Sequence, residues 1–174
     1  MGSTGIDFAT LSARDVLDLA ILIEDEAEER YEELARQLDI HRTPEAAAFF
    51  RQMARNEATH RVRLLERRRR LFDDAPRTMT RALLWDVEAP EYDEARAFMT
   101  VRDAMETALR SEEKARAFFV EALRHIEEPQ VRALLVELRD EEVDHQRMIR
   151  RELDRLAGRP PIDDEDFTDE PTSQ

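Results

Sequence analysis

Apolar residues recur every three or four positions in four long stretches of the chain, which is the spacing of an amphipathic α-helix. In the first stretch Val16, Leu19, Ile23 and Tyr31 share one face. We expect helices over residues 13–38, 44–71, 101–126 and 129–158. Helix-favouring residue types dominate and only three glycines occur, so the sequence predicts an all-α protein.

Capping signals mark where these helices begin. The segments "SARD" (Ser12–Asp15) and "TVRD" (Thr100–Asp103) each place a hydroxyl residue three positions before an acid, as in a capping box. The segment "TPE" (Thr43–Glu45) predicts a cap followed by a proline in the first turn, and Pro129 opens the last helix.

The two halves of the chain repeat one pattern, a pair of helices joined by a short turn. Residues 73–99 are less regular, with candidate short helices near Trp85 and Ala95, and are long enough to cross from one end of a bundle to the other. The sequence therefore predicts a four-helix bundle of two helical hairpins joined by a long crossover. We expect an N-terminal extension over 1–11, the bundle over 12–158 and an acidic disordered tail over 159–174.

Each expected helix carries one glutamate in the middle of its apolar face. These residues are Glu24, Glu57, Glu112 and Glu142. In the second and fourth helices a histidine follows three residues later, His60 in "EATH" and His145 in "EEVDH". Carboxylates buried together would repel one another unless cations neutralised them. Four carboxylates and two imidazoles suit two adjacent iron or manganese ions, so we expect a two-metal site.

Other interpretations exist for single features. One Glu-x-x-His in so acidic a chain is typical of a surface ion pair, and its repetition in both halves is what favours metal. Tyr31 is a candidate to hydrogen-bond a ligand carboxylate, with packing alone as the alternative. Asp140 and Asp144 are either solvated acids or groups that orient the histidines. His41 and His125 lack ligand spacing, and we expect both at the surface.

Composition narrows the possible partners. The net charge of −14 argues against nucleic acid and anionic membranes, and the basic run "RRRR" at 67–70 ends a helix whose dipole favours positive charge there. No apolar run approaches the roughly 18–20 residues of a membrane span, and "MGSTGIDFATLS" lacks the features of a signal peptide. The absence of cysteine excludes disulfides and thiolate metal sites. We expect a cytoplasmic protein.

Four segments, "AILIEDEAEERYEELA", "EATH", "RSEEKARAFF" and "EEVDH", together resemble the rubrerythrin-like branch of the ferritin-like di-iron proteins over about residues 11–156. The resemblance implies a ferritin-like bundle that holds two iron ions, with manganese as an alternative. It implies one metal held mainly by Glu24, Glu57 and His60. The other would be held mainly by Glu112, Glu142 and His145, and the bridges would be Glu57 and Glu142.

This sequence departs from full rubrerythrins in two respects. It has no cysteine for the rubredoxin-type Cys₄ iron centre that passes electrons to the di-iron site in that family. Where full rubrerythrins have a further glutamate three residues after the third-helix ligand, this chain has Ala115. Both differences favour ferrous oxidation over efficient peroxidase turnover.

We therefore expect a di-iron oxidoreductase that oxidises Fe²⁺ with O₂ or H₂O₂, in iron handling or defence against oxidative stress, and that uses an external electron donor. One alternative is an iron-binding cargo or partner module with slow redox chemistry, which docks into a larger shell through its acidic tail. A metal-free structural bundle is the other alternative. The resemblance also implies at least a homodimer, with Leu83, Leu84 and Trp85 as candidate contacts.

Overall fold

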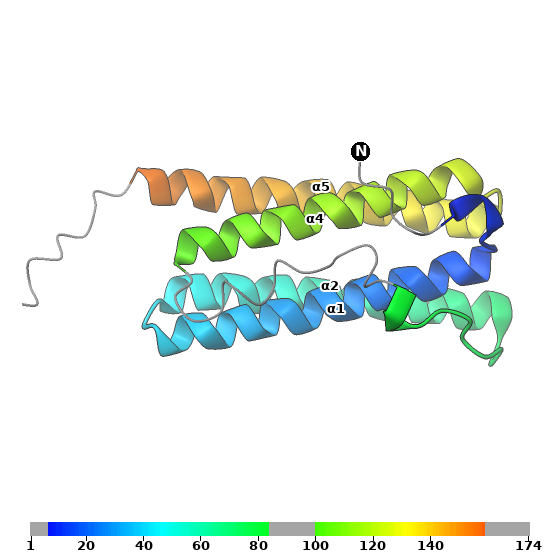
Figure 1. Cartoon of the computed structure of the whole chain (residues 1–174), viewed down its shortest axis with the longest axis horizontal. Coiled ribbons are helices and arrows are strands. Elements are labelled where there is room, and N and C mark those ends of the chain that lie inside the picture. The colour runs from blue at the N-terminus through cyan, green and yellow to red at the C-terminus, as the bar shows by residue number, and fades with distance from the viewer. Residues whose placement is uncertain (1–6, 84–99, 159–174) are drawn as a thin grey trace, which may run out of the picture.

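The computed structural model describes residues 7–83 and 100–158, and over these residues it forms a bundle of long helices (Figure 1). The helices are α1 (Ala13–Ile40), α2 (Pro44–Phe72), α4 (Val101–His125) and α5 (Pro129–Ala157). Two short 3₁₀ turns, η1 (Phe8–Thr10) and η2 (Arg81–Leu83), complete the described elements. Over the described residues the prediction of an all-α bundle of four long helices is confirmed, and each helix boundary lies within two residues of its expected place.

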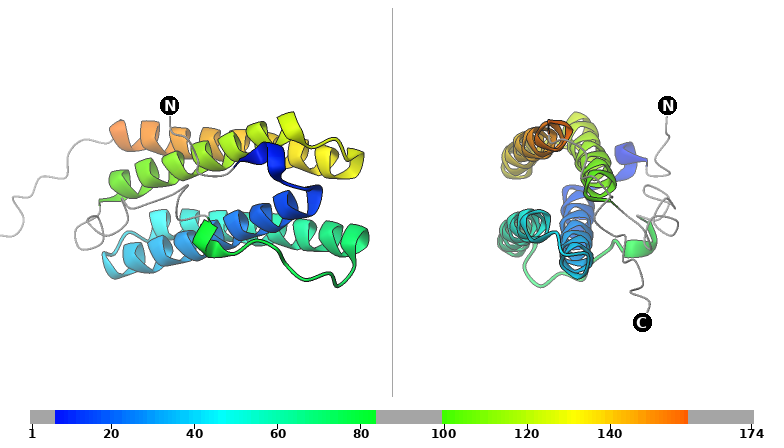
Figure 2. Two further views of the ribbon diagram at one scale, coloured as in Figure 1. Left: turned by 45° about the vertical axis from the view of Figure 1, so that its right-hand side comes forward. Right: turned by 90° about the vertical axis from the view of Figure 1, so that its left-hand side faces the viewer.

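The bundle consists of two helical hairpins that lie against each other. Helices α1 and α2 run antiparallel and form the first hairpin, and α4 and α5 form the second (Figure 2). Helix α1 also contacts α4, and α2 contacts α5. The helices of one hairpin pack together much more extensively than helices of different hairpins do.

Hydrogen bonds at the helix starts follow the sequence signals in part. Ser12 before α1 and Thr100 before α4 both form the expected capping boxes with the acid three residues later. Thr43 does stand before the proline that opens α2, but its side chain makes no cap hydrogen bond. Its hydroxyl instead donates to the carbonyl of Leu38 at 2.8 Å. Thr43 therefore occupies the expected N-cap position, but its hydroxyl bonds to the end of the preceding helix instead of capping α2.

Two apolar clusters fill the interior, one on either side of a polar layer. The first apolar cluster has as its largest fully buried side chains Leu17, Leu19, Ile21, Leu64, Phe119, Leu135 and Leu138. The second apolar cluster has Tyr31, Phe50, Met53 and Met105. In every helix one buried glutamate separates residues of one cluster from residues of the other. The fold therefore encloses a layer of acids between two water-excluding layers.

A buried ion pair near the start of α1 was not predicted. Asp18 is fully buried, and the guanidinium of Arg68 in α2 donates to it from Nε and, at 3.4 Å, from Nη2. The backbone N–H of Thr78 donates to the same carboxylate at 3.0 Å. Arg68 belongs to the basic run expected at the end of the second helix, and α2 does end nearby. Because Arg68 follows Leu64 by four residues, its helix face is the buried one.

Several of the expected features involve residues that the structure does not describe. The candidate short helices near Trp85 and Ala95, the tail over 159–174 and the dimer contacts at Leu84 and Trp85 lie outside the described residues. Among the helices that the structure does describe, none combines the length and the apolar character needed to cross a membrane.

Candidate metal centre

The polar layer brings together all six residues singled out in the sequence. Each of the four helices contributes one glutamate, and α2 and α5 each add a histidine one turn later. Every one of these residues is at most 5% exposed, and the six are Glu24, Glu57, His60, Glu112, Glu142 and His145. The apolar face of each helix buries its glutamate because that face packs against the other three helices.

The histidines face the carboxylates through the same ring nitrogen. Nδ1 of His60 lies 3.4 Å from Oε2 of Glu24 and 3.2 Å from Oε2 of Glu57. Nδ1 of His145 lies 3.1 Å from Oε1 of Glu57 and 3.1 Å from Oε2 of Glu112. The two oxygens of Glu57 thus face different histidines, as a bridging carboxylate requires.

The donor atoms fall into two overlapping groups. Glu24, Glu57, His60 and Glu142 each offer an atom within 4.8 Å of the others, and so do Glu57, Glu112 and His145. Glu57 belongs to both groups, while Glu142 joins the group around His60 and lies with Oε2 3.8 Å from Nδ1 of His145. Two neighbouring cation positions that share carboxylates therefore match this layer.

The outer nitrogens of the two histidines meet different partners. Nε2 of His60 lies 2.9 Å from Oε2 of Glu141, whereas Nε2 of His145 lies 3.4 Å from Nδ2 of Asn56. Neither partner was singled out in the sequence. Each directly precedes the glutamate of a Glu-x-x-His motif, and each reaches the histidine of the opposite motif. That position next to a motif glutamate is the sequence signal that could have identified them.

The acids considered as alternatives for this role lie at the surface. Asp140 pairs with Arg139, and Asp144 pairs with Arg147. Both aspartates are exposed, so of the two interpretations the solvated one holds. His41 and His125 are also exposed, as expected.

Tyr31 links the second apolar cluster to the carboxylates. Its ring is fully buried, and its hydroxyl donates a hydrogen bond to Oε1 of Glu112 in the opposite hairpin. The hydrogen-bonding interpretation of Tyr31 is therefore correct. At the equivalent place in the second half of the chain stands Phe119, which has no hydroxyl to donate.

Burial and close charges shift the pKa of most of these groups. Burial raises the pKa of Glu24 and of Glu142 well above the ordinary value, and neighbouring carboxylates add to the effect. Burial alone would lower the pKa of both histidines. Close contacts with the negatively charged carboxylates outweigh it and raise the pKa of His60 to about 9 and of His145 to about 10.

The pKa of Glu57 is shifted in the opposite direction from those of Glu24 and Glu142. Burial alone would raise its pKa, but the close contacts with both histidines hold the pKa of this carboxyl far below its usual range. In the absence of metal the layer therefore keeps its charge low with protons on the histidines and on Glu24 and Glu142.

Several buried donor and acceptor atoms of the layer make no hydrogen bond within the described residues. They are Oε1 of Glu24, Oε1 of Glu57, Nδ1 of His60 and Oε2 of Glu142. Unpaired buried polar atoms are costly, and the same four residues each offer a ligand atom within 4.8 Å of the others. Carboxylate oxygens and imidazole nitrogens are ligands of iron and manganese, and four carboxylates balance two divalent cations. The cluster therefore fits a di-iron site.

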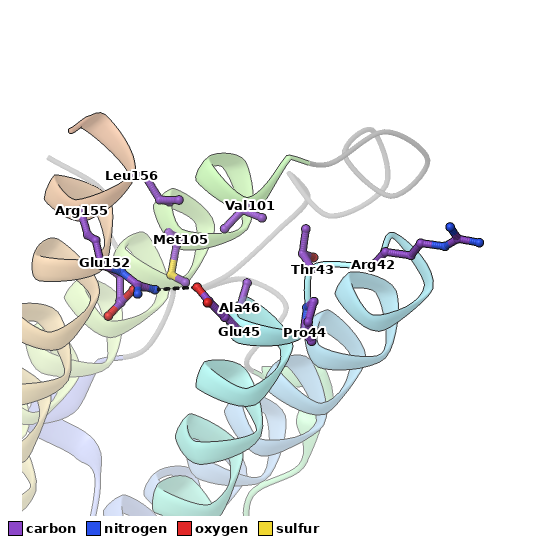
Figure 3. Close-up of a pocket in the computed structure, with 10 residues that line it drawn as sticks. All are labelled: Arg42, Thr43, Pro44, Glu45, Ala46, Val101, Met105, Glu152, Arg155 and Leu156. Atoms are coloured by element: carbon purple, nitrogen blue, oxygen red, sulfur yellow. Dashed lines mark ion pairs between the residues drawn. The ribbon is translucent and has the colours of Figure 1, made fainter. Parts of the chain in front are cut away.

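A separate pocket of about 230 Å³ lies where the α1–α2 turn meets the start of α4 and the end of α5 (Figure 3). An ion pair between Glu45 and Arg155, 3.6 Å apart, joins α2 to α5 across it. Met105 in its lining precedes Glu112 by seven residues, or about 10 Å along the helix. The second apolar cluster therefore stands between this pocket and the carboxylates.

Comparisons with known proteins agree with this geometry. A family model described as Rubrerythrin matches residues 15–153. An uncharacterized conserved protein from Magnetospirillum magnetotacticum MS-1 superposes with a TM-score of 0.72 at 28% identity, covering 87% of this chain and 99% of that one. A hypothetical protein from Pyrococcus furiosus gives a TM-score of 0.63 at 23% identity, covering 86% of this chain and 92% of its own, which shows the fold.

A search of curated proteins found no match. The family model covers most of the chain, including all six residues of the polar layer, and the solved structures share the bundle over most of their length. This chain therefore belongs to the rubrerythrin family, with a ferritin-like four-helix bundle built around a buried cluster that fits a di-iron site.

Proposed function

We propose that this protein is a di-iron oxidoreductase of the ferroxidase or peroxidase type, which oxidises Fe²⁺ with O₂ or H₂O₂. The observation that carries the proposal is the buried layer of four carboxylates and two imidazoles, which offers two overlapping groups of close ligand atoms and leaves several buried polar atoms without a hydrogen bond among the described residues. Iron handling and defence against oxidative stress are the roles that such chemistry serves.

The ligands divide between two positions. Glu24, Glu57 and His60 would hold one iron, with Glu142 reaching it from the opposite hairpin. Glu112 and His145 would hold the other, together with Glu57. Bound iron supplies one electron per ion to the oxidant, and manganese fits the same ligands.

The protein's own groups prepare the site. The two apolar clusters exclude water on both sides, which strengthens the interactions between charges inside the layer. Protons held by His60, His145, Glu24 and Glu142 leave when cations bind, since a ligand atom must give up its proton. Tyr31 keeps Glu112 in place through its hydroxyl.

Ala115 supports ferrous oxidation over peroxidase cycling. It lies on α4 one turn beyond Glu112 and packs against the first apolar cluster. A methyl group there cannot supply the further carboxylate that the resemblance to full rubrerythrins would lead one to expect. We infer that electrons for any repeated turnover come from an external donor.

Anaerobic Fe²⁺ titration followed by stopped-flow mixing with O₂, and separately with H₂O₂, tests the proposal. We expect two iron ions per chain and rapid oxidation in the wild type, and loss of both in a Glu57→Ala/Glu142→Ala variant. A matched control is Glu113→Ala, which removes an exposed glutamate next to Glu112 that pairs with Arg150. Wild-type oxidation rates in the double variant would sink the proposal.

The acidic sequence of residues 159–174 motivates a second candidate, an iron-binding cargo that docks into a larger shell. Deleting these residues separates the two functions. If the deletion leaves Fe²⁺ oxidation in solution unchanged but abolishes co-purification of a partner, docking is favoured. If both oxidation and co-purification are unchanged, only the oxidoreductase function is supported.

A further inference from the structure

The two halves of the metal centre repeat one ligand pattern but differ in what surrounds each histidine. His60 faces a carboxylate through Nε2, and His145 faces an amide. A histidine that binds a cation through Nδ1 keeps its hydrogen on Nε2 and donates it outward. The strength of that outward bond tunes how strongly the ring donates to the cation.

The partner of His60 is a negatively charged acceptor held in place. Oε2 of Glu141 lies 2.9 Å from Nε2, and Nη1 of Arg63 donates to both oxygens of Glu141 at 2.7 and 2.9 Å. Arg63 also pairs with Glu137, so one guanidinium serves two carboxylates and a net negative charge is left beside His60. Hydrogen bonds to a charged acceptor are shorter and stronger than neutral ones.

The partner of His145 is poorly suited to accept. The atom of Asn56 that faces Nε2 is the amide nitrogen Nδ2, at 3.4 Å. The amide oxygen Oδ1 faces the other way and accepts from Nε2 of Gln52 at 2.9 Å. Gln52 therefore competes with His145 for the acceptor that the histidine would need.

The glutamates on the first helix of each hairpin, Glu24 and Glu112, also differ in how much negative charge they offer a cation, and the difference again favours the half with His60. Oε1 of Glu112 accepts a hydrogen bond from Tyr31, which draws negative charge away from that carboxylate group. Oε1 of Glu24 has no hydrogen-bond partner among the described residues. The half that contains Glu24 and His60 therefore keeps more electron density on its ligand atoms.

We propose that the two cation positions have unequal affinities, so that the position at His60 fills first and the position at His145 fills second and exchanges more readily. This inference rests on the proposed two-metal function and adds an order of loading to it. Glu141 is the positioning residue that sets the difference, acting through His60, and Asn56 is its weaker counterpart.

Anaerobic calorimetric titration with Fe²⁺, repeated with Mn²⁺, measures the two steps without any turnover. We expect the wild type to bind two ions with dissociation constants that differ at least tenfold. Glu141→Gln should weaken the tighter step by about 10-fold, and Glu141→Ala by up to about 100-fold, with the second step unchanged. Asn56→Asp should tighten the second step by about 10-fold, because it places a carboxylate behind His145.

Asp140→Asn is the matched control. It removes one negative charge from the residue next to Glu141, but Asp140 is exposed and pairs with Arg139 instead of a histidine. Both binding steps should match the wild type, and helical circular dichroism should match in every variant.

The outcomes separate the inference from the proposed function. Equal wild-type affinities overturn the inference, and so does an effect of Glu141→Gln on the second step alone or on neither step. In each of these cases two ions still bind and the proposed function stands. Absence of any binding to the wild type would overturn both.

Discussion

At the scale of the residue, the hydrogen bond between Tyr31 and Glu112 shows how the interior satisfies one of its carboxylates. The tyrosine is fully buried and its hydroxyl comes from the opposite hairpin. Its ring also packs against Phe50, with centroids 5.8 Å apart. The side chain therefore has a polar role and an apolar role that one substitution can separate.

Tyr31→Phe keeps the packing and removes the donor. We expect the metal-free protein to lose about 1–3 kcal/mol in its free energy of unfolding, because a buried acceptor is left without its partner. Urea unfolding with a chelator present measures this loss. In a Glu112→Gln background the same substitution should cost clearly less, since the two residues interact directly. An equal loss in both backgrounds would mean that Tyr31 acts by packing alone.

The shifted pKa values predict how pH affects the metal-free protein. The folded state holds protons on His60 and His145 up to about pH 9 and 10, whereas unfolded histidine releases them near 6.5. Raised pKa values at Glu24 and Glu142 act in the same direction. The folded state therefore binds more protons than the unfolded state, and stability should fall as pH rises from about 6.5 towards 10.

Urea midpoints measured with a chelator at pH 6, 8 and 9.5 test this expectation. A His60→Gln/His145→Gln variant should show a smaller decline, because the contributions of the two histidines in the alkaline range are gone. With saturating Mn²⁺ the decline should be reduced, since cations replace the protons. A midpoint that rises with pH in the metal-free wild type would contradict the prediction.

Sequence reasoning located the six residues of the polar layer because position on an apolar helix face determines burial. A glutamate among leucines and alanines must lie inside wherever that face packs. It did not locate Glu141 or Asn56, since both are only half-buried and their contact depends on how the opposite hairpin is placed. Asp18 and Arg68 were missed for a related reason, being 50 residues apart.

At the scale of the element, local signals were sufficient for the helices and insufficient for their connections. The capping boxes at Ser12 and Thr100 use residues within one turn, so the sequence alone reveals them. The start of the crossover is fixed instead by a distant contact. Arg68 and Thr78 meet on Asp18, and Arg68 also donates to the carbonyl of Ala75 at 2.9 Å. This arrangement holds the segment after α2 against α1.

Arg68→Ala should destabilise the protein by about 3–5 kcal/mol, because it leaves the carboxylate of Asp18 buried without its cation. Because the backbone N–H of Thr78 still donates to Asp18 in this variant, we expect a loss at the lower end of that range. Thermal and urea unfolding measure the loss. Arg70→Ala, in the same helix turn but exposed, is the control and should change stability by no more than about 0.5 kcal/mol. A loss below about 1 kcal/mol for Arg68→Ala would show that the pair is not structurally important.

At the scale of the whole molecule, the two hairpins are repeats of one plan with their ligands at matching depth. The order of apolar cluster, glutamate and second apolar cluster in α1 recurs in α5, and α2 and α4 run through it in reverse. The sequence revealed this plan through spacing alone. Spacing alone could not reveal the pairing of ligands across the hairpins, and only the bridging role that the resemblance implies for Glu142 pointed to its place beside His60.

That pairing has a mechanical consequence. Each cation position draws donors from both hairpins, whose backbones lie farther apart than those of the helices within one hairpin. Bound cations would therefore act as cross-links between the hairpins, in addition to the two apolar clusters that both hairpins share. Hydrogen exchange should slow on the facing sides of α1 and α4 when Mn²⁺ is added, and much less in a Glu57→Ala/Glu142→Ala variant. The rigidity of the whole protein would then depend on how much metal is available to it.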